Sequence, residues 1–376
     1  MSKIKEIIVF SIGDSLELKT WSNVPYFFTK SLEDNQIKIN RVNIDENYVL
    51  SIIYKYSIFA FLKLFYKNSN HTYFRSGLNY YLTNLKIRNA IKKYNKSDAH
   101  LFLTYSFCSK NYSSKKTVLF SDWSYLYYLN TFLNRKPFWF EKKTLKREEK
   151  HIELSDAVIS LFPKSNKFNA SNYKNLNLYY LGNVINSNYK LNKIDLITKK
   201  LVSNKLLFIG NKKYLKGALD LINAFKELSN KNIELHIVGL KEEDVNVILP
   251  NLFYYGYLNK GIIDENELYY KLISEAKAII NTNPDWGAFS AMTEAMYFYT
   301  PIITSPYSEF TETYGNDISF GYYINNDSKL ELLSNIDFIL NISNEKYLNI
   351  MNNAHDIVED FNWGKYSNKV LEILSR

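Results

Sequence analysis

The sequence predicts an α/β protein made of two doubly wound lobes, each built on a parallel sheet. The chain has 376 residues, which is long for one domain and suits two domains of roughly 150 to 200 residues. Short apolar runs alternate with segments of helical periodicity, as in repeated βαβ units. This pattern stops in a Lys- and Asn-rich gap at 187–204 and then starts again. We therefore expect the two lobes to join near residue 190.

The first lobe opens with an apolar run that ends at Gly13, followed by a helix that Ser22 and Pro25 introduce. Its predicted strands are 6–12, 99–104, 117–121 and 156–161. The second lobe repeats the arrangement, with helices expected near 216–229, 265–276 and 289–299. Its predicted strands are 205–210, 233–239, 277–281 and 301–304.

The segment 51–67 is apolar on nearly every side of a helix, and Lys55, Lys63 and Lys67 interrupt it. Such a helix either fills a core or lies in a membrane interface, with its lysines reaching toward lipid head groups. A second aromatic and basic stretch, 125–150, has two interpretations as well: membrane contact, or a helix pair with one apolar face. Both alternatives stay open for both segments.

Charge and aromatic content limit the classes of molecule that the protein is expected to bind. The 47 basic and 38 acidic residues leave a net charge of +9, which attracts the phosphates of nucleotides, nucleic acids or anionic lipids. Acidic residues are spread among the lysines, which argues against nucleic acid. Aromatic residues reach 16%, including 32 Tyr; they suit sugar stacking or a membrane interface, although a coding bias toward Tyr would look the same.

Cysteine and histidine usage indicates no metal site. Cys108 is the single cysteine and the five histidines are scattered, so we expect no disulfide and no zinc ligand set. The apolar N-terminal run is too short for a signal peptide, and no apolar stretch reaches 18 residues. We therefore expect a cytoplasmic protein, with peripheral attachment to the inner membrane face left open.

Two places in the second lobe have the chemistry of a phosphate and ribose site. Gly210 ends a strand, and Lys216-Gly217 precedes an apolar helix. Free backbone N–H groups at such a junction, together with a lysine, can hold a diphosphate, although a solvated lysine in a turn fits equally. Gly287 permits close approach to a ligand, and Glu294 in the following helix could accept hydrogen bonds from both ribose hydroxyls.

With these residues the second lobe resembles the nucleotide-sugar-binding lobe of the group 1 glycosyltransferases, family 4, in the GT-B superfamily. The matching positions are Gly210, Lys216-Gly217, Val238-Gly239, Gly256-Tyr257, Glu294-Ala295-Met296, Pro301, Glu312, Gly321 and Phe361-Asn362-Trp363. The first lobe resembles the family more loosely, through Gly13 and the segment 182–186.

The resemblance implies two Rossmann-like lobes facing across a cleft, an acceptor lobe at 1–188 and a donor lobe at 189–359. A C-terminal helix, about 360–376, would cross back to the first lobe. It also implies retaining, metal-independent transfer from a nucleotide-diphosphate sugar, with no other cofactor. The acceptor would be a glycan or a lipid-linked saccharide, as in bacterial surface polysaccharide synthesis.

The resemblance also implies roles for individual residues. Lys216 would bind the diphosphate and Glu294 the ribose, while the amides from Gly287 through Ala288 to Phe289 would bind the β-phosphate or the sugar. The full expected donor set is Gly13, Asn211, Lys212, Lys216, Gly217, Trp286, Gly287, Ala288, Phe289 and Glu294. Asp122 and Asp285 are the expected catalytic residues.

Three positions depart from the family pattern. Asn211 replaces a phosphate-binding arginine, which leaves Lys212 or Lys213 as substitutes without the bidentate fork. Trp286 stands where the first motif glutamate belongs, so either Asp285 reaches the sugar, Trp286 stacks on it, or Trp286 only packs the loop.

The third departure is Asp122, which stands where many relatives have a histidine. It could act as a base toward the acceptor or could cap a helix at 123–130. With family positions changed, a catalytically silent GT-B protein that binds a nucleotide sugar or a partner is the main alternative function.

Overall fold

The computed structural model describes residues 4–187, 189–228, 232–282, 289–325 and 328–376. The chain forms two compact units. Unit 1 comprises Met1–Asn183 and Trp363–Arg376, and unit 2 comprises Val184–Asn362.

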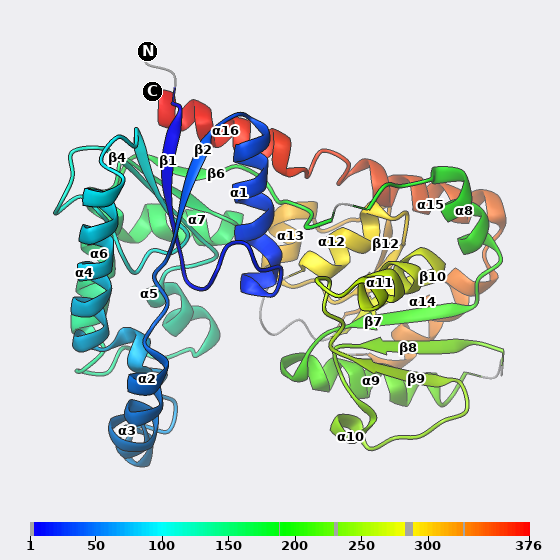
Figure 1. Ribbon diagram of the computed structural model, residues 1–376. Helices are drawn as coiled ribbons and strands as arrows, with labels where there is room; N and C mark the ends of the chain where they lie inside the picture. Colours follow the sequence, from blue (N-terminus) through cyan, green and yellow to red (C-terminus); the bar gives the residue numbers. More distant parts are fainter. Residues whose placement is uncertain (1–3, 188, 229–231, 283–288, 326–327) are drawn as a thin grey trace. The chain divides into compact units, whose positions relative to one another are not determined.

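Unit 1 is built on a parallel sheet in the order β2-β1-β3-β4-β5-β6 (Figure 1). The short interior strands β3 and β5 are buried at every position, which is why they are mostly apolar. The strands are β1 (Glu6–Ser11), β2 (Lys38–Asn43), β3 (Ala99–Phe102), β4 (Lys116–Ser121), β5 (Ala157–Ser160) and β6 (Leu178–Tyr180).

Helices flank this sheet, and the last helix of the chain belongs to unit 1. Figure 1 shows α16 beside α1, where the Phe28 and Trp363 rings stack 5.1 Å apart and Ser31 Oγ donates to the Trp363 carbonyl. The helices are α1 (Val24–Asp34), α2 (Tyr48–Tyr54), α3 (Ala60–Phe65), α4 (Gly77–Lys93), α5 (Tyr125–Tyr127), α6 (Lys142–Leu154), α7 (Pro163–Asn172) and α16 (Trp363–Ser375).

Unit 2 repeats the architecture with the parallel order β12-β11-β10-β7-β8-β9. Its central strand β10 is buried throughout. The strands are β7 (Lys205–Ile209), β8 (Glu234–Val238), β9 (Leu252–Gly256), β10 (Ala276–Asn281), β11 (Ile302–Thr304) and β12 (Gly321–Tyr323). The helices are α8 (Lys193–Leu201), α9 (Leu215–Phe225), α10 (Glu242–Val245), α11 (Ile263–Glu275), α12 (Ser290–Tyr297), α13 (Ser308–Tyr314), α14 (Lys329–Asn341) and α15 (Asn344–Asp356).

The predicted fold class, two Rossmann-like lobes with parallel sheets, is confirmed by these two sheets and their flanking helices. Each predicted strand coincides with an observed strand. The strands β2, β6, β9 and β12 lacked a strand signal, and all four lie at the edges of their sheets.

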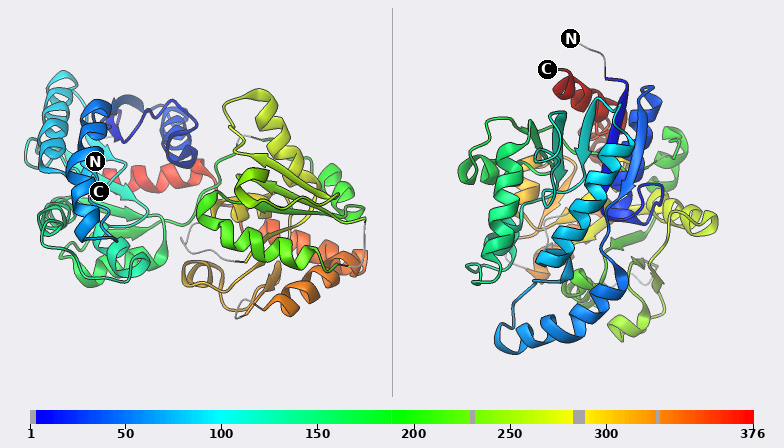
Figure 2. Two further views of the ribbon diagram at one scale, coloured as in Figure 1. Left: turned by 90° about the horizontal axis from the view of Figure 1, so that it is seen from below. Right: turned by 60° about the vertical axis from the view of Figure 1, so that its left-hand side comes forward.

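The segment 51–67 does not fill a core. A π-helical turn at Lys55–Phe59 joins α2 to α3, and the resulting helix projects from the body of unit 1 (Figures 1 and 2). Most of its side chains are exposed, so the core interpretation is wrong. The expectation that no apolar stretch reaches 18 residues is also wrong: Tyr48–Phe65 is long and apolar enough to cross a membrane.

Candidate functional site

The carboxyl ends of β7 and β8 in unit 2 meet in a glycine-lined turn. The Gly210 amide donates to the Val238 carbonyl at 2.9 Å. Gly239 has φ +97°, and a Cβ there would lie 2.5 Å from the Gly210 carbonyl oxygen. Since a larger residue at 239 would clash with backbone, the two loops can approach each other only because this position is glycine.

The predicted phosphate-binding residues lie directly after this turn. The Asn211 side chain accepts from the Lys213 amide at 3.0 Å and so begins the short 3-10 turn Lys212–Tyr214. Helix α9 then starts at Leu215 and places Lys216 and Gly217 in its first turn, with Lys216 exposed. The amides of a first helical turn have no partner within the helix, so this end of α9 has the polarity that an anion requires.

Thr282 connects this helix end to the neighbouring strand. Its hydroxyl donates to the Gly217 carbonyl at 3.2 Å, and Thr282 directly follows β10. The structure thus brings the Lys216-Gly217 turn next to the carboxyl end of β10. Asp285, Trp286, Gly287 and Ala288 lie outside the described residues.

Lys212 is already paired. Its Nζ lies 2.6 Å from Asp244 Oδ1 of α10, and this contact raises the pKa of the exposed lysine. A phosphate would have to compete with Asp244 for Lys212.

Phe289 contributes its side chain to the core. Its ring is buried against Tyr307, Phe310 and Tyr314, just before α12 begins. Its backbone, rather than its ring, is therefore the part that can face a donor.

Glu294, in the middle of α12, is only 5% exposed and its carboxylate is fully engaged. Lys260 Nζ lies 2.6 Å from Oε1 and 2.8 Å from Oε2. The Tyr269 hydroxyl donates to Oε2 at 2.9 Å and the Tyr270 hydroxyl to Oε1 at 3.2 Å. A carboxylate has about four lone-pair sites, so a ribose diol would have to replace one of these donors.

The partners of Glu294 are Lys260, Tyr269 and Tyr270, and the sequence pattern did not predict them. Burial and the Glu294 charge raise the pKa of both tyrosines, which keeps them protonated as donors. A usable signal was present, because a buried carboxylate needs a cation and hydrogen bonds. Only the fold shows which of the many lysines supplies it.

In unit 1, Asp122 lies at the carboxyl end of β4. Its Oδ2 accepts from Trp21 Nε1 at 3.3 Å, whereas its buried Oδ1 has no hydrogen-bond partner among the described residues. Burial raises the pKa of Asp122 to about 7. The cap alternative is wrong, because the Ser124 hydroxyl accepts from the Tyr127 amide and caps α5 instead.

Two other features lie at the same edge of this sheet. Gly13 follows β1 with φ +88°, and its amide donates to Asn43 Oδ1 at 3.2 Å. Trp21, Ser22 and Asn23 all have positive φ, a conformation that costs energy for residues other than glycine. The Trp21 ring also packs edge-on against Phe120, so a strained loop holds this indole over Asp122.

Comparison with known families decides the class of unit 2. Residues 192–356 match the family model described as "Glycosyl transferases group 1". Unit 2 is a group 1 glycosyl transferase domain.

Several solved structures resemble the whole chain in fold. Sucrose-phosphate synthase from Thermosynechococcus elongatus has a TM-score of 0.68 at 14% identity, covering 99% of this chain and 98% of that one. Anabaena Alr3699/HepE in complex with UDP-glucose has a TM-score of 0.61 at 14% identity, covering 98% and 99%. WaaG, a glycosyltransferase of lipopolysaccharide biosynthesis, has 0.63 at 13%, covering 99% and 100%. The chain therefore has the GT-B fold. No curated protein sequence matches it.

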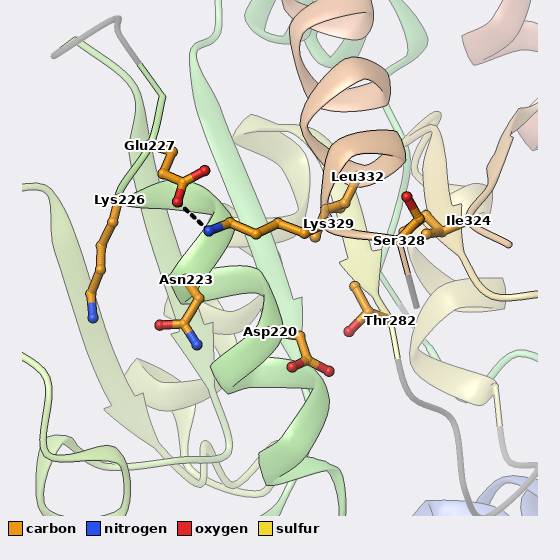
Figure 3. A pocket seen from close by; sticks show the side chains of 9 residues that line it. All are labelled: Asp220, Asn223, Lys226, Glu227, Thr282, Ile324, Ser328, Lys329 and Leu332. Carbon is orange, nitrogen blue, oxygen red and sulfur yellow. Dashed lines mark hydrogen bonds and ion pairs between the residues drawn. The ribbon is translucent and has the colours of Figure 1, made fainter. Parts of the chain in front are cut away.

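A pocket of about 340 Å³ lies on the glycosyl transferase domain between α9 and α14 (Figure 3). The ion pair between Glu227 and Lys329 spans one side of it, and Thr282 lies at the other. Its remaining lining residues are Asp220, Asn223, Lys226, Ile324, Ser328 and Leu332. Within the described part of the chain, none of the predicted donor residues lines this pocket. The α9 turn is therefore the candidate donor site.

Proposed function

We propose that this protein is a retaining glycosyltransferase that moves a sugar from a nucleotide-diphosphate sugar to a glycan or a lipid-linked acceptor. The observation that carries the proposal is the junction of Lys216 and Gly217 with Thr282 inside a group 1 glycosyl transferase domain. Structures with the same fold support the choice of donor, since Anabaena Alr3699/HepE was solved with UDP and with UDP-glucose.

The proposed chemistry follows from charge. When the sugar leaves, negative charge develops on the nucleoside diphosphate, and preorganised donors must stabilise it. The Lys216 ammonium and the first-turn amides of α9 supply a cation and aligned N–H dipoles in one place. We propose that these groups fulfil the role without a metal cofactor, and that Asp285 or Trp286 contacts the sugar.

Asp122 is the proposed base for the acceptor hydroxyl on unit 1. Its buried Oδ1 has no protein partner in the described residues, and its pKa of about 7 suits proton transfer near neutral pH. We place the reaction in the cytoplasm, in the synthesis of a bacterial surface polysaccharide.

The first experiment is a thermal-shift screen against UDP-, GDP-, ADP-, TDP- and CMP-sugars, because a ligand that binds only the native state raises the melting temperature. Nucleotide sugars of one class should raise the melting temperature of the wild type. Lys216→Ala should lower the affinity for that nucleotide sugar by tenfold or more. Lys226→Ala, which removes a cation at the other end of α9, is the matched control. Equal affinity in all three proteins would refute the α9 site.

A second candidate function is a GT-B protein that binds a nucleotide sugar without turning it over. The saturated carboxylate of Glu294 and the neutral Asn211 favour it. The two functions separate in one assay. Release of nucleoside diphosphate that depends on a saccharide acceptor supports the enzyme, whereas donor binding without release across an acceptor panel supports the silent binder.

A further inference from the structure

We propose that the projecting helix of unit 1, residues 48–67, docks in the plane of an anionic lipid bilayer and holds the protein at the membrane surface. We call this segment the arm. The arm belongs to unit 1, whereas the proposed donor site belongs to unit 2.

The exposure of the arm is the first observation. Many of its aromatic and aliphatic side chains face solvent, with Tyr56 and Leu64 each 75% exposed and Phe65 67% exposed. The other exposed apolar residues of the arm are Tyr48, Val49, Ile52, Ile53, Ile58 and Phe61. A contiguous apolar surface of this kind marks a site that another apolar phase covers.

Both ends of the arm are fixed to the same body, which argues against a membrane crossing. Before the arm, the buried Ile44 donates its amide to the Ser11 carbonyl at 2.9 Å. Within and after it, the buried Tyr54 hydroxyl lies 3.0 Å from Nδ1 of the buried His71. Eighteen helical residues span about 27 Å, enough for one crossing only, and one crossing would leave the two ends on opposite sides.

The lysines support the same conclusion. A crossing would bury Lys55 near the centre of the hydrocarbon, which costs about 2.5 to 3.5 kcal/mol, and would bury Lys63 closer to one end. A helix in the interface instead lets these side chains reach the head groups. Their ammonium groups already lie over the rings of Tyr56 and Phe59.

An aromatic loop continues the surface at the far end of the arm. The Tyr66 ring packs on Phe138 and Phe140, at centroid distances of 4.7 and 5.2 Å. Trp139 Nε1 donates to the Tyr66 hydroxyl at 3.2 Å, and Trp139 is 70% exposed. An exposed tryptophan beside apolar residues and lysines is typical of a membrane interface. The fold thus joins the two aromatic and basic stretches of the sequence into one surface.

Charge selects an anionic bilayer as the occupant. From Asn47 to Ser97 the chain has nine basic residues and no acidic one. Each lysine or arginine near an anionic membrane contributes about 1 kcal/mol, whereas two copies of the arm packed together would set like charges against each other.

The test is co-sedimentation of the full chain with vesicles of phosphatidylglycerol and phosphatidylcholine in equal parts. Phe61→Ser with Phe65→Ser should weaken binding by about tenfold or more. Lys55→Gln, Lys63→Gln and Lys67→Gln together should weaken it by about 100-fold. The control is Leu176→Ser with Ile194→Ser, which removes two exposed apolar side chains outside the arm, 98% and 79% exposed.

Any one of the following three results would overturn the proposal. Absence of wild-type binding, or equal binding by the arm variants and the wild type, refutes the docking surface. A concentration-dependent dimer that only the phenylalanine pair abolishes, without vesicle binding, assigns the arm to a second copy of the chain. If the protein resists extraction from the vesicles at alkaline pH, the arm is a helix that crosses the membrane. Nucleotide-sugar binding is measured without vesicles, so failure here leaves the proposed function intact, and the reverse holds as well.

Discussion

At the scale of single residues, Asp122 combines three properties that point to a functional carboxylate. It lies at the carboxyl end of a parallel strand, one of its oxygens has no partner among the described residues, and a strained loop holds Trp21 against the other. A buried acceptor without a partner costs about 1 to 3 kcal/mol. A function that uses this oxygen would account for the cost.

The first prediction concerns Asp122→Asn. If Asp122 is the base, transfer should rise with pH as the carboxyl ionises, level off above about pH 7, and fall by about 10² to 10⁴-fold in the variant. Donor affinity should not change. The measurement is initial rate against pH, with Asp34→Asn at the exposed end of α1 as the control.

The same shift has a consequence for stability. Burial raises the pKa of Asp122 from its ordinary value, so the folded state holds the proton more tightly than the unfolded state does. The contribution to stability is therefore greatest below about pH 4 and is lost as pH rises toward 7. Asp122→Asn should remove this part of the pH dependence; an unchanged urea-unfolding profile from pH 4 to 7 would contradict the burial argument.

The second prediction concerns the Lys260 and Glu294 pair. Lys260→Met leaves a buried carboxylate without its cation, which should lower the free energy of unfolding by about 3 to 5 kcal/mol. Adding Glu294→Gln should restore much of that loss, because the remaining groups are neutral. Urea unfolding measures both, with Lys271→Met on the exposed side of α11 as the control. A single variant as stable as the wild type would show that the pair is not structural.

Site residues could be predicted from the sequence where residues nearby in the chain determine their local structure. The turn at Gly210 and the helix start at Lys216 follow from local pattern alone. The cage around Glu294 does not, because Lys260 and Tyr269 come from another loop and helix that only the tertiary fold brings together.

At the scale of elements, the strands that lacked a sequence signal share a position in their sheets. β2, β6, β9 and β12 close the edges of the two sheets, where one side of the strand has no neighbour. β2 carries polar residues in the run KINRVN and so lacks the continuous apolar signature of a buried strand. β6 and β12 are only three residues long, which is too short for a recognisable pattern.

The arm has a strong apolar pattern, but the sequence does not show what surrounds it. Its apolar residues satisfy the pattern of a core helix and of an interfacial helix equally, because periodicity reports polarity and says nothing of what lies opposite. The structure decides that the arm is exposed, since Tyr54 alone among residues 48–67 is buried.

The third prediction concerns the loop that carries Trp139. Glu141 is fully buried and accepts two hydrogen bonds from Arg135, at 2.7 and 2.8 Å, and one from the Tyr125 hydroxyl at 2.8 Å. Burial opposes ionisation, but these bonds and the Phe138 amide hold the pKa of Glu141 below its ordinary value. Arg135→Met should therefore destabilise unit 1 by about 3 to 5 kcal/mol.

Urea unfolding tests this expectation. Lys136→Met is the matched control, because it removes the neighbouring exposed cation and should change stability by less than about 0.5 kcal/mol. Equal effects of the two substitutions would show that the Arg135 and Glu141 pair does not hold the loop.

At the scale of the whole molecule, the two-lobe fold was predictable because the βαβ rhythm occurs twice and stops between the two occurrences. The position of α16 does not follow from the order of elements in the chain. This helix lies at the far end of the sequence, but it packs on α1 and completes unit 1. No local pattern states where a helix docks. The resemblance to GT-B proteins supplied that expectation, since hydrophobic periodicity alone shows only that the helix has an apolar face.

Two units with separate cores lead to the fourth prediction, which tests the donor site against the architecture. A donor bound by unit 2 alone should stabilise only residues 184–362. At a concentration 100 times its Kd it should raise their free energy of unfolding by about 2.7 kcal/mol, and with it the temperature of their melting transition. Calorimetry with the nucleotide sugar found in the screen measures this. Arg135→Met and Lys260→Met assign the two transitions, because each weakens one unit. A ligand that shifts the transition of unit 1, or both transitions equally, would place donor contacts outside the α9 turn and the Glu294 cage.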